Sequence, residues 1–380
     1  MESKDGTYTT VKLGEASYKA FNPINLGKAP PVTFNIKLVN LLSEANRFIG
    51  KLDEITDILI SPSFFVEMFA RKESAMSSQI EGTQATFSDF LKIEAGIREK
   101  EIPDDVKEIS NYFEALNYGL ERVNTLPLSL RLIREVHEIL LKDVRGQDKN
   151  PGEFRRSQNW IGGRSINTAT YVPPPVPEMH NKLDNFEKYL HQNDDIPHLI
   201  KAALIHAQFE LIHPFLDGNG RIGRLLITFY LKHKNVISKP TLYLSKYFKK
   251  YRKYYYNALL NVSEKQDYKE WVEFFLEGII ETSQEGVELA REIKDLREND
   301  LHKIQSLGRS VKNGDILFNH LFENPVVSID DVVNLLNIKF PNAQNIVNKL
   351  IDQRILHHYD DRKRNRLYQY SDYLEILLKE

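Results

Sequence analysis

The sequence predicts a mainly α-helical bundle protein that carries a small β-hairpin and ends in a winged helix-turn-helix domain. Apolar residues recur at helical spacing through most of the first 300 residues. Two stretches, 196–215 and 221–234, are apolar nearly all round, as helices buried in a bundle are. After Leu307 the segments become short and amphipathic. We therefore expect three domains: an N-terminal arm and helical region (1–110), a helical core (111–300) and a winged-helix-like domain (301–380).

The first part of the chain is predicted to be an arm followed by helices. Residues 1 to about 35 are polar and contain prolines, which favours an extended arm. From Asn35 the apolar residues follow a helical period as far as Leu59. A second helix should begin at Ser61 and Pro62, a typical capping signal, and run to Gly82. Further helices are expected at about 86–98, 104–123 and 129–142.

Glycines, prolines and the β-favouring segment "TATYV" interrupt this pattern between residues 146 and 177, where we expect a loop and a short hairpin. The two buried helices follow, joined by "HPFLDGNG". Helices continue from 244 to 300, and the last charged run is typical of a solvated connecting helix. Beyond Leu307 the sequence predicts three short helices and a hairpin over 357–370, the order found in a winged helix.

Composition narrows the function classes only slightly. The chain is 41% hydrophobic and 27% charged, with 51 Lys+Arg against 53 Asp+Glu, so overall charge favours neither a nucleic acid nor a membrane as partner. The absence of cysteine excludes disulfides, thiolate nucleophiles and cysteine-ligated metals. The start of the sequence lacks a signal-peptide pattern, and we find no apolar run near 18 residues. A cytoplasmic location without membrane contact is the default expectation.

The segment "HPFLDGNGRIGR" (213–224) concentrates the chemistry. Gly218, Asn219 and Gly220 can bring backbone N–H groups close to a ligand, at the positive end of the following helix. Arg221 and Arg224 lie three apart on the first turn, where guanidinium groups suit phosphate oxygens.

The other polar side chains of the segment complete a phosphate-transfer site. Asp217 can supply one ligand to Mg²⁺. His213 suits a general base near neutral pH, and Phe215 is expected to point inward as an anchor. Each part alone also has an ordinary structural explanation. Their combination between two buried helices favours the phosphate site.

This segment resembles the signature of the Fic family, H-x-F-x-[D/E]-G-N-G-R-x-x-R, at every fixed position. The resemblance implies a protein adenylyltransferase that moves AMP from ATP to a hydroxyl side chain of a target protein and releases pyrophosphate. It implies that His213 deprotonates the hydroxyl and that Asp217 binds Mg²⁺. The remaining signature positions would bind the nucleotide phosphates: Gly218, Asn219, Gly220, Arg221, Ile222, Gly223 and Arg224.

The resemblance extends over roughly residues 30–290. "GEFRRSQNWIGG" and "YVPPP" look like the family's flap (about 152–175), on which the target would dock by strand addition. Ile161, Gly162 and Gly163 would then lie near the nucleotide. Tyr255 and Tyr256 match tyrosines of the adenine pocket, although packing between helices explains them equally well.

A second motif indicates regulation. "SSQIEG" places Ser77 and Glu81 four apart on one helical face, with Gly82 able to end the helix. On sequence alone Glu81 is more simply a solvated glutamate. The segment resembles the inhibitory motif [S/T]-x-x-x-E-[G/N] of the Fic family, which implies that Glu81 pairs with Arg224 and keeps it from the γ-phosphate of ATP.

Rival functions stay open at this stage. The basic group Arg362, Lys363, Arg364 and Arg366 at the expected wing tip is a candidate contact for DNA phosphates, so a DNA-binding regulator is a second candidate function. Residues 301–380 contain 11 Lys/Arg and 10 Asp/Glu, which favours protein contacts or dimerisation equally. The sequence is also compatible with transfer of another phosphate-containing group, with removal of AMP from modified targets, and with self-modification.

Overall fold

The structure is a computed structural model that describes residues 6–13, 16–27, 29–94, 103–359 and 366–379. Two compact units form: the first comprises the chain up to Gly50 together with Phe69–Ser283, and the second comprises Lys51–Met68 and Gln284–Glu380. Three helices belong partly to each unit: α1 (Ile36–Asp57), α2 (Pro62–Ile80) and α11 (Tyr268–Gln305). The expected three-domain division stays a prediction.

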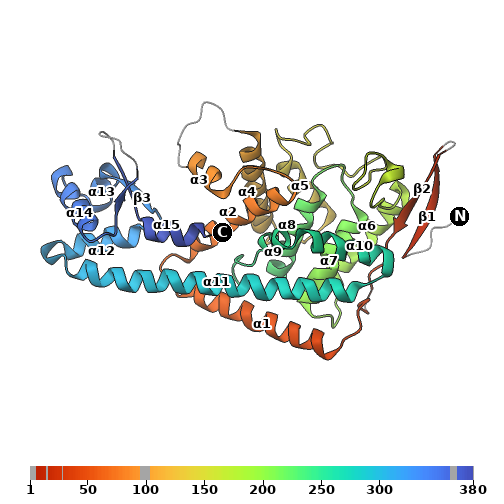
Figure 1. The fold of residues 1–380 in the computed structure, drawn as a ribbon, viewed down its shortest axis with the longest axis horizontal. Helices are drawn as coiled ribbons and strands as arrows, with labels where there is room; N and C mark the ends of the chain where they lie inside the picture. The colour runs from red at the N-terminus through yellow and green to blue at the C-terminus, as the bar shows by residue number, and fades with distance from the viewer. Residues whose placement is uncertain (1–5, 14–15, 28, 95–102, 360–365, 380) are drawn as a thin grey trace. The chain divides into compact units, whose positions relative to one another are not determined.

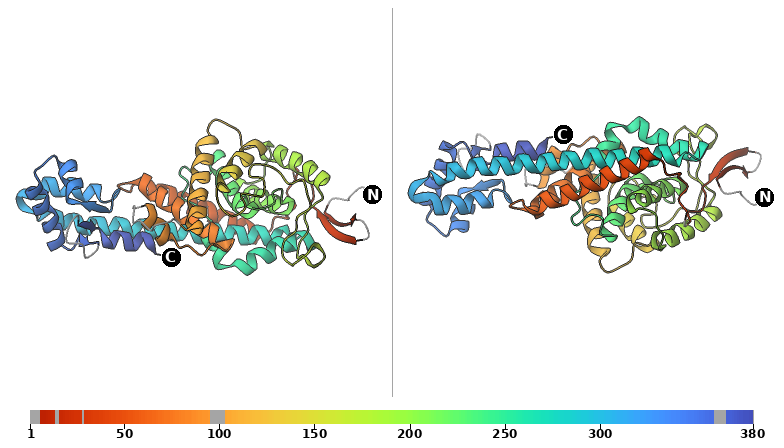
Figure 2. Two further views of the ribbon diagram at one scale, coloured as in Figure 1. Left: turned by 90° about the horizontal axis from the view of Figure 1, so that it is seen from above. Right: turned by 90° about the horizontal axis from the view of Figure 1, so that it is seen from below.

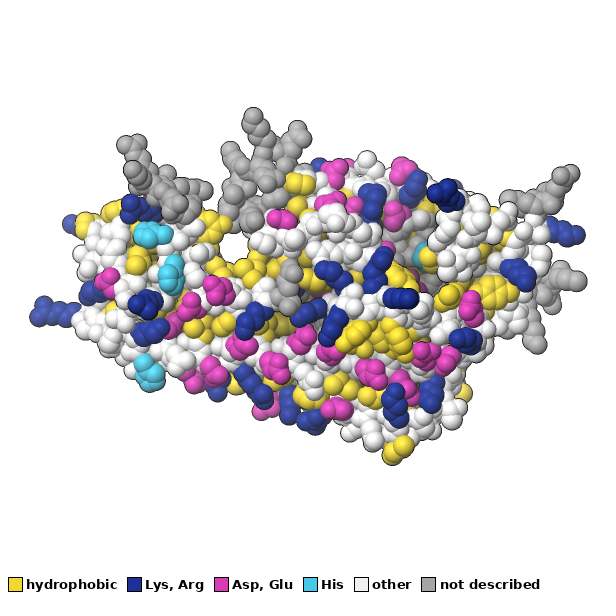
Figure 3. Space-filling view, viewed as in Figure 1, with side chains coloured by type: hydrophobic (Ala, Val, Ile, Leu, Met, Phe, Trp, Pro, Cys, Tyr) yellow, Lys and Arg dark blue, Asp and Glu magenta, His cyan; other side chains and the backbone are white. Residues whose placement is uncertain are grey.

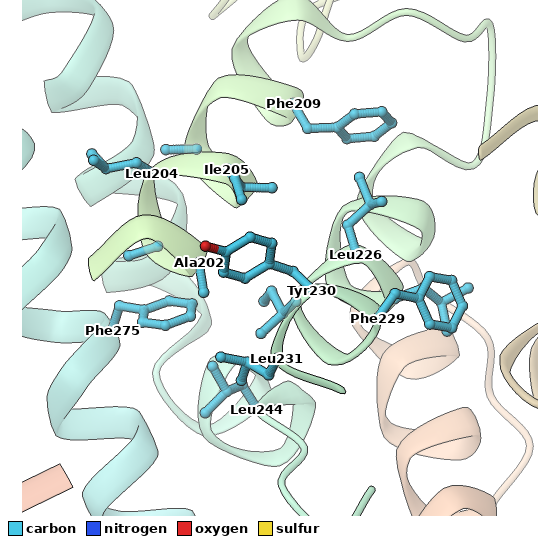
Figure 4. Packing of buried hydrophobic residues seen from close by; sticks show 14 of the residues in the cluster. Ala202, Leu204, Ile205, Phe209, Leu226, Phe229, Tyr230, Leu231, Leu244 and Phe275 are labelled. Carbon is cyan, nitrogen blue, oxygen red and sulfur yellow. The ribbon is translucent and has the colours of Figure 1, made fainter. Parts of the chain in front are cut away.

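The first unit is built around α7 (His198–Ile212) and α8 (Asn219–His233), the two helices that flank the signature segment. Almost every residue of both helices is buried, because apolar side chains occur on all sides. Figure 4 shows Phe209 and Leu226 from the two helices among the packed side chains, together with Tyr230 and Phe275. The core is therefore arranged around the segment that carries the candidate site.

Other helices of the first unit enclose this centre. The N-terminal part of α1 runs alongside the N-terminal part of α11, where Lys37 pairs with Glu273 at 2.7 Å (Figures 1 and 2). The remaining helices are α3 (Phe87–Glu94), α4 (Asp104–Arg122), α5 (Leu130–Leu140), α6 (Val176–His191), α9 (Ser245–Lys250) and α10 (Arg252–Lys265). Within the described residues the predicted helices of this unit are present. The predicted end of α3, 95–98, lies outside those residues.

Three local features differ from the sequence-based expectations. The arm contains an antiparallel hairpin, β1 (Thr7–Leu13) and β2 (Ala16–Asn22), because Phe21 buries its ring and its N–H donates to the carbonyl of Val172. The expected flap hairpin reduces to one β-bridge between Ile161 and Tyr171, with a 3₁₀ turn η1 (Ile166–Thr168) between them. Helix α6 was not predicted, although its buried apolar residues follow a helical period.

The second unit contains the C-terminal segment. After the turn η2 (Gly308–Ser310), three helices occur in the predicted order: α12 (Val311–His320), α13 (Ile329–Leu336) and α14 (Phe340–Asp352). The predicted strand pair, β4 (His357–His358) and β5 (Leu367–Gln369), is extended by β3 (Val326–Ser328) into a sheet of order β3-β5-β4, and an unpredicted helix α15 (Ser371–Leu378) follows. Acidic and basic side chains are interspersed on the face shown in Figure 3.

Candidate functional site

The signature loop begins where α7 ends and is held by its own side chains. His213 takes the left-handed conformation (φ 46°) that closes α7, and its N–H donates to the carbonyl of Phe209 at 2.9 Å. The amide of Asn219 both accepts from the N–H of Phe215 and donates to its carbonyl, each at 2.8 Å. Phe215 is fully buried, as predicted for an anchor. The side chain of Asn219 therefore shapes the loop, and only its backbone N–H is left to face a ligand.

His213 has the geometry of a general base. Its Nδ1 lies 3.3 Å from the carbonyl oxygen of Glu210, which only accepts, so Nδ1 carries the proton and Nε2 keeps a free lone pair. Burial and, to a smaller extent, the charge of Arg155 lower the pKa of His213, while the Glu210 carbonyl and Glu81 raise it, and the resulting pKa is about 4. The ring is consequently neutral near pH 7, as proton acceptance requires.

Two residues that sequence reasoning missed hold the loop against the flap segment. Nδ1 of His137 accepts from the N–H of Gly152 at 2.8 Å, so Nε2 must donate to the carbonyl of Asp217 at 3.0 Å. The ring also stacks on Phe215, with 3.7 Å between centroids. Arg155 is buried, and its Nε donates to the carbonyl of His213 at 3.0 Å. No local sequence pattern indicates that His137 or Arg155 holds the loop. His137, for example, lies on the apolar face of an ordinary amphipathic helix.

Arg221 is a buried guanidinium with unused donors. Only 1% of its side chain is exposed, and Asp217 and Glu108 lie 3.7 and 3.8 Å away, beyond hydrogen-bond distance. Within the described part of the chain, its Nε, Nη1 and Nη2 have no hydrogen-bond partner. Since a buried charge is costly unless it is paired and hydrogen-bonded, this side chain suits an anionic ligand.

Arg224 is bound by the helix that precedes the site. Its Nη2 donates to Oε1 of Glu81 at 2.8 Å and to the carbonyl of Ser77 at 3.0 Å, and its Nε donates to Oγ of Ser77 at 2.8 Å. Burial alone would raise the pKa of Glu81, but the charge and the hydrogen bond of Arg224 hold it below the usual value. The predicted contact between Glu81 and Arg224 is confirmed.

Two glycines make this contact sterically feasible. Helix α2 ends at Ile80, and Gly82 turns the chain directly after Glu81 with a φ of 104°, which favours glycine. A Cβ on Gly220 would lie 2.3 Å from Oε1 of Glu81, so the carboxylate rests directly against the first turn of α8. A negative group at a helix N-terminus is favourable. Glu81 thus occupies the position that an anionic ligand would take.

A cavity of about 570 Å³ lies beside this helix end, within the size range of small-molecule sites. Eight predicted site residues line it: Glu81, Ile161, Gly162, His213, Gly220, Arg224, Tyr255 and Tyr256. Residues that were not predicted also line it: Trp160, Thr170, Tyr171, Glu210, Leu211, Arg252, Asn257, Leu259 and Leu260. The predicted nucleotide-binding residues outside its lining are Gly163, Asp217, Gly218, Asn219, Arg221, Ile222 and Gly223, and the predicted inhibitory residues Ser77 and Gly82 also lie outside it.

The two predicted tyrosines differ in character. Tyr255 is 1% exposed, its hydroxyl lies 2.9 Å from Nε2 of His206, and its ring stacks on Phe248, so most of its surface serves packing between helices. Tyr256 is 38% exposed, and the guanidinium of Arg252 lies over its ring, 5.3 Å from the centroid. Tyr256 is the better placed of the two to meet a ligand.

Asp217 fits the role of a single magnesium ligand. Its Oδ1 accepts from the N–H of Gly218 at 2.6 Å, and its side chain is 35% exposed. Within the described ranges no group of three or more His, Asp or Glu side chains could hold a metal ion. An ion here would depend on Asp217, phosphate oxygens and water, the ligand set that Mg²⁺ prefers.

The candidate nucleic-acid contacts fall mostly outside the structure. Arg362, Lys363 and Arg364 lie outside the described residues, and Arg366 is exposed directly before β5. In the described parts of the chain, no helix is both long enough and apolar enough to cross a membrane.

A neutral histidine, the buried Arg224 and a helix N-terminus lie beside one cavity, an arrangement that suits a phosphorylated ligand. Residues 127–231 match the Fic/DOC family, and residues 39–121 match the Fic/DOC family N-terminal region. The chain therefore carries a Fic/DOC domain together with the N-terminal region that accompanies it.

Individual relatives agree with this assignment. The chain is 31% identical over 221 residues to "Protein adenylyltransferase Fic" of Drosophila mojavensis, covering 55% of this chain and 42% of that protein. It is 35% identical over 127 residues to the protein of the same name from Drosophila grimshawi, covering 33% of this chain and 24% of that protein. The matched region thus spans less than half of these curated relatives.

Solved structures share the fold. A Fic family protein from Desulfovibrio desulfuricans G20 superposes with a TM-score of 0.61 at 21% identity, covering 90% of this chain and 98% of that one. A Fic domain containing signaling protein from Bacteroides thetaiotaomicron gives a TM-score of 0.52 at 19% identity, covering 67% of this chain and 97% of that one. The mainly helical Fic fold of this chain is therefore established.

Proposed function

We propose that this chain is a protein adenylyltransferase that transfers AMP from ATP to a hydroxyl group of a target protein, and that Glu81 holds it in a resting state. The observation that carries the proposal is the placement of His213, Arg224 and Gly220 at the N-terminus of α8 beside one cavity. Names of the relatives support the same reaction.

The proposed reaction uses groups already described. The target hydroxyl loses its proton to Nε2 of His213 while its oxygen forms a bond to the α-phosphorus of ATP. The bond from that phosphorus to the bridging oxygen breaks, and pyrophosphate leaves. Arg221, Arg224 and the first N–H groups of α8 stabilise the negative charge on the phosphates. Asp217 would hold Mg²⁺, which supplies further neutralisation of that charge.

The position of the Glu81 carboxylate supports the proposed inhibition. Its carboxylate occupies both the donor Nη2 of Arg224 and the space above Gly220, where phosphate oxygens would otherwise bind. ATP and the carboxylate would compete for the same positive groups. We infer that ATP binds the resting protein in a pose unsuited to attack, and that release of Glu81 permits transfer.

The decisive experiment is an intact-mass measurement. Protein carrying Glu81→Gly is incubated with Mg²⁺ and each nucleoside triphosphate in turn. A mass gain of one AMP with ATP supports the proposal and reveals self-modification, whereas a gain of one phosphate contradicts AMP transfer. The double variant Glu81→Gly, His213→Ala is the matched control and should gain no mass. This assay detects only self-modification. Transfer to another protein is therefore tested by labelling a cell extract with radioactive ATP.

The C-terminal segment is proposed to be a winged helix-turn-helix domain, supported by the order α12, α13, α14 and the three-stranded sheet. Whether it contacts DNA, another protein or a second copy of the chain stays a prediction, as do the docking of a target on the flap and the cytoplasmic location.

A further inference from the structure

One acidic residue in the wall of the cavity has no role in the reaction described so far. Glu210 lies in the last turn of α7, three residues before His213, and both side chains line the same cavity. Its Oε2 is 4.0 Å from Nδ1 of His213, and 11% of the side chain is exposed. A carboxyl group beside a general base is well placed to influence that base.

The surroundings of Glu210 keep its carboxyl at this place. Its Oε1 is buried and has no hydrogen-bond partner among the described residues. A Cβ on Gly223 of α8 would lie 2.3 Å from this oxygen, so the glycine leaves the room that the carboxyl fills. Contact with α8 on one side and with the ring on the other confines the carboxyl to the edge of His213.

Several titratable groups surround the pair. Burial raises the pKa of Glu210 to about 8, with Arg224 acting to lower it and Glu81 to raise it. Because the pKa of His213 is about 4, the carboxyl holds a proton near pH 7 and the ring does not. The groups that face the two residues come from α2 (Glu81), α7 (His206), α8 (Arg224), α10 (Tyr255 and Tyr256) and the flap segment (Arg155 and Tyr171).

We propose that Glu210 is a positioning residue for His213, whose ionised carboxylate stabilises the positive charge that the ring gains when Nε2 takes the proton of the target hydroxyl. This inference rests on the proposed transfer reaction. The proton moves from the hydroxyl oxygen to Nε2, the oxygen bonds to the α-phosphorus, and pyrophosphate leaves. The carboxylate lies on the opposite side of the ring, beside Nδ1–H, and acts only through the imidazole.

The low basicity of the buried His213 ring favours this role for Glu210. Burial makes His213 a weak base, whereas the best general base has a pKa near the working pH. A negative charge 4.0 Å from Nδ1 favours the protonated ring and strengthens the base. The transfer rate should therefore rise with pH as Glu210 ionises.

The kinetic test uses the full chain with Glu81→Gly. There kcat/KM should rise through an ionisation at or below about pH 8, because removal of Glu81 takes away one charge that raises the pKa of Glu210. Adding Glu210→Gln should abolish this rise and lower the rate at its plateau by about 10- to 100-fold, the size expected for the loss of one charge about 4 Å from the ring. The control variant is Glu187→Gln, which alters a carboxylate elsewhere in the unit that accepts from the N–H of Leu130. It should keep both the rise with pH and the plateau rate.

Two kinetic outcomes would overturn the proposal. One is a Glu210→Gln protein that retains the rise with pH. The other is a variant whose rate falls equally at every pH together with a lower melting temperature, which means that Glu210 serves packing alone.

A second measurement is independent of catalysis. In NMR spectra of the full chain, the ring signals of His213, assigned by their loss in His213→Ala, should show a titration step near pH 8 when Glu210 ionises. Glu210→Gln should lack this step and Glu187→Gln should keep it. A parent protein without the step contradicts the inference. If the step is present but Glu81→Gly transfers no nucleotide, the pairing of the two residues stands and the proposed function fails.

Discussion

Nη2 of Arg224 donates to Oε1 of Glu81 at 2.8 Å, across 143 residues of sequence. The acceptor follows the last turn of α2, and the donor lies in the second turn of α8, beside Gly220. The contact links the region before the Fic/DOC domain to the domain itself. Its consequences can be measured.

Glu81→Gly should raise AMP transfer about tenfold or more, because it frees a donor held by a charge-assisted hydrogen bond worth ~1.5–3 kcal/mol. Ser77→Ala, which removes the bond between Oγ and Nε of Arg224 but leaves Glu81 in place, should raise it less. Initial rates with radioactive ATP rank the three proteins. Equal rates for Glu81→Gly and the parent would exclude inhibition by this contact.

His213→Ala in the Glu81→Gly background should lower kcat by about 10²- to 10⁴-fold, the usual contribution of a general base. The pH profile gives a second check. Because burial lowers the pKa of His213 to about 4, the ring is neutral above that pH, and the loss of rate due to its protonation should lie near pH 4, below the rise assigned to Glu210. A fall near pH 6.5 that His213→Ala abolishes would mean that the ring is solvated.

Gly220→Ala tests the phosphate position. Residue 220 lies within α8, where alanine is compatible with the backbone, but its Cβ would meet Oε1 of Glu81 at 2.3 Å. In the Glu81→Gly background the added methyl group should raise KM for ATP about tenfold, the cost of one phosphate contact. Gly50→Ala on α1, where a Cβ meets nothing within 4 Å, is the matched control. An unchanged KM would place the phosphates elsewhere.

His137→Ala should destabilise the first unit by roughly 2–4 kcal/mol, since it leaves a cavity and two buried backbone groups unpaired. Those groups are the N–H of Gly152 and the carbonyl of Asp217, so transfer should also slow. Urea unfolding measures the stability change. A fully stable variant that still transfers AMP would show that the stack on Phe215 is dispensable.

Local patterns predicted much of the fold. Helical periodicity and capping signals identified α1, α2, α4, α5, α7 and α8 to within a few residues, because hydrogen bonds along a helix depend on neighbours in sequence. The β1–β2 hairpin escaped prediction because its support comes from the distant Val172. Helix α6 escaped although its periodic signal was present in the sequence.

The site likewise combines features that the sequence predicts with features that only the tertiary structure decides. The sequence by itself determined the loop from His213 to Gly220, since its turn, its anchor Phe215 and its helix N-terminus all lie within a few residues of one another. Tertiary structure alone decided that His137 and Arg155 hold this loop, that Glu210 lies against Gly223, and that Arg221 has unused donors. A buried polar group must find its partner in whatever element packs against it, and that element is chosen by the packing of the whole core.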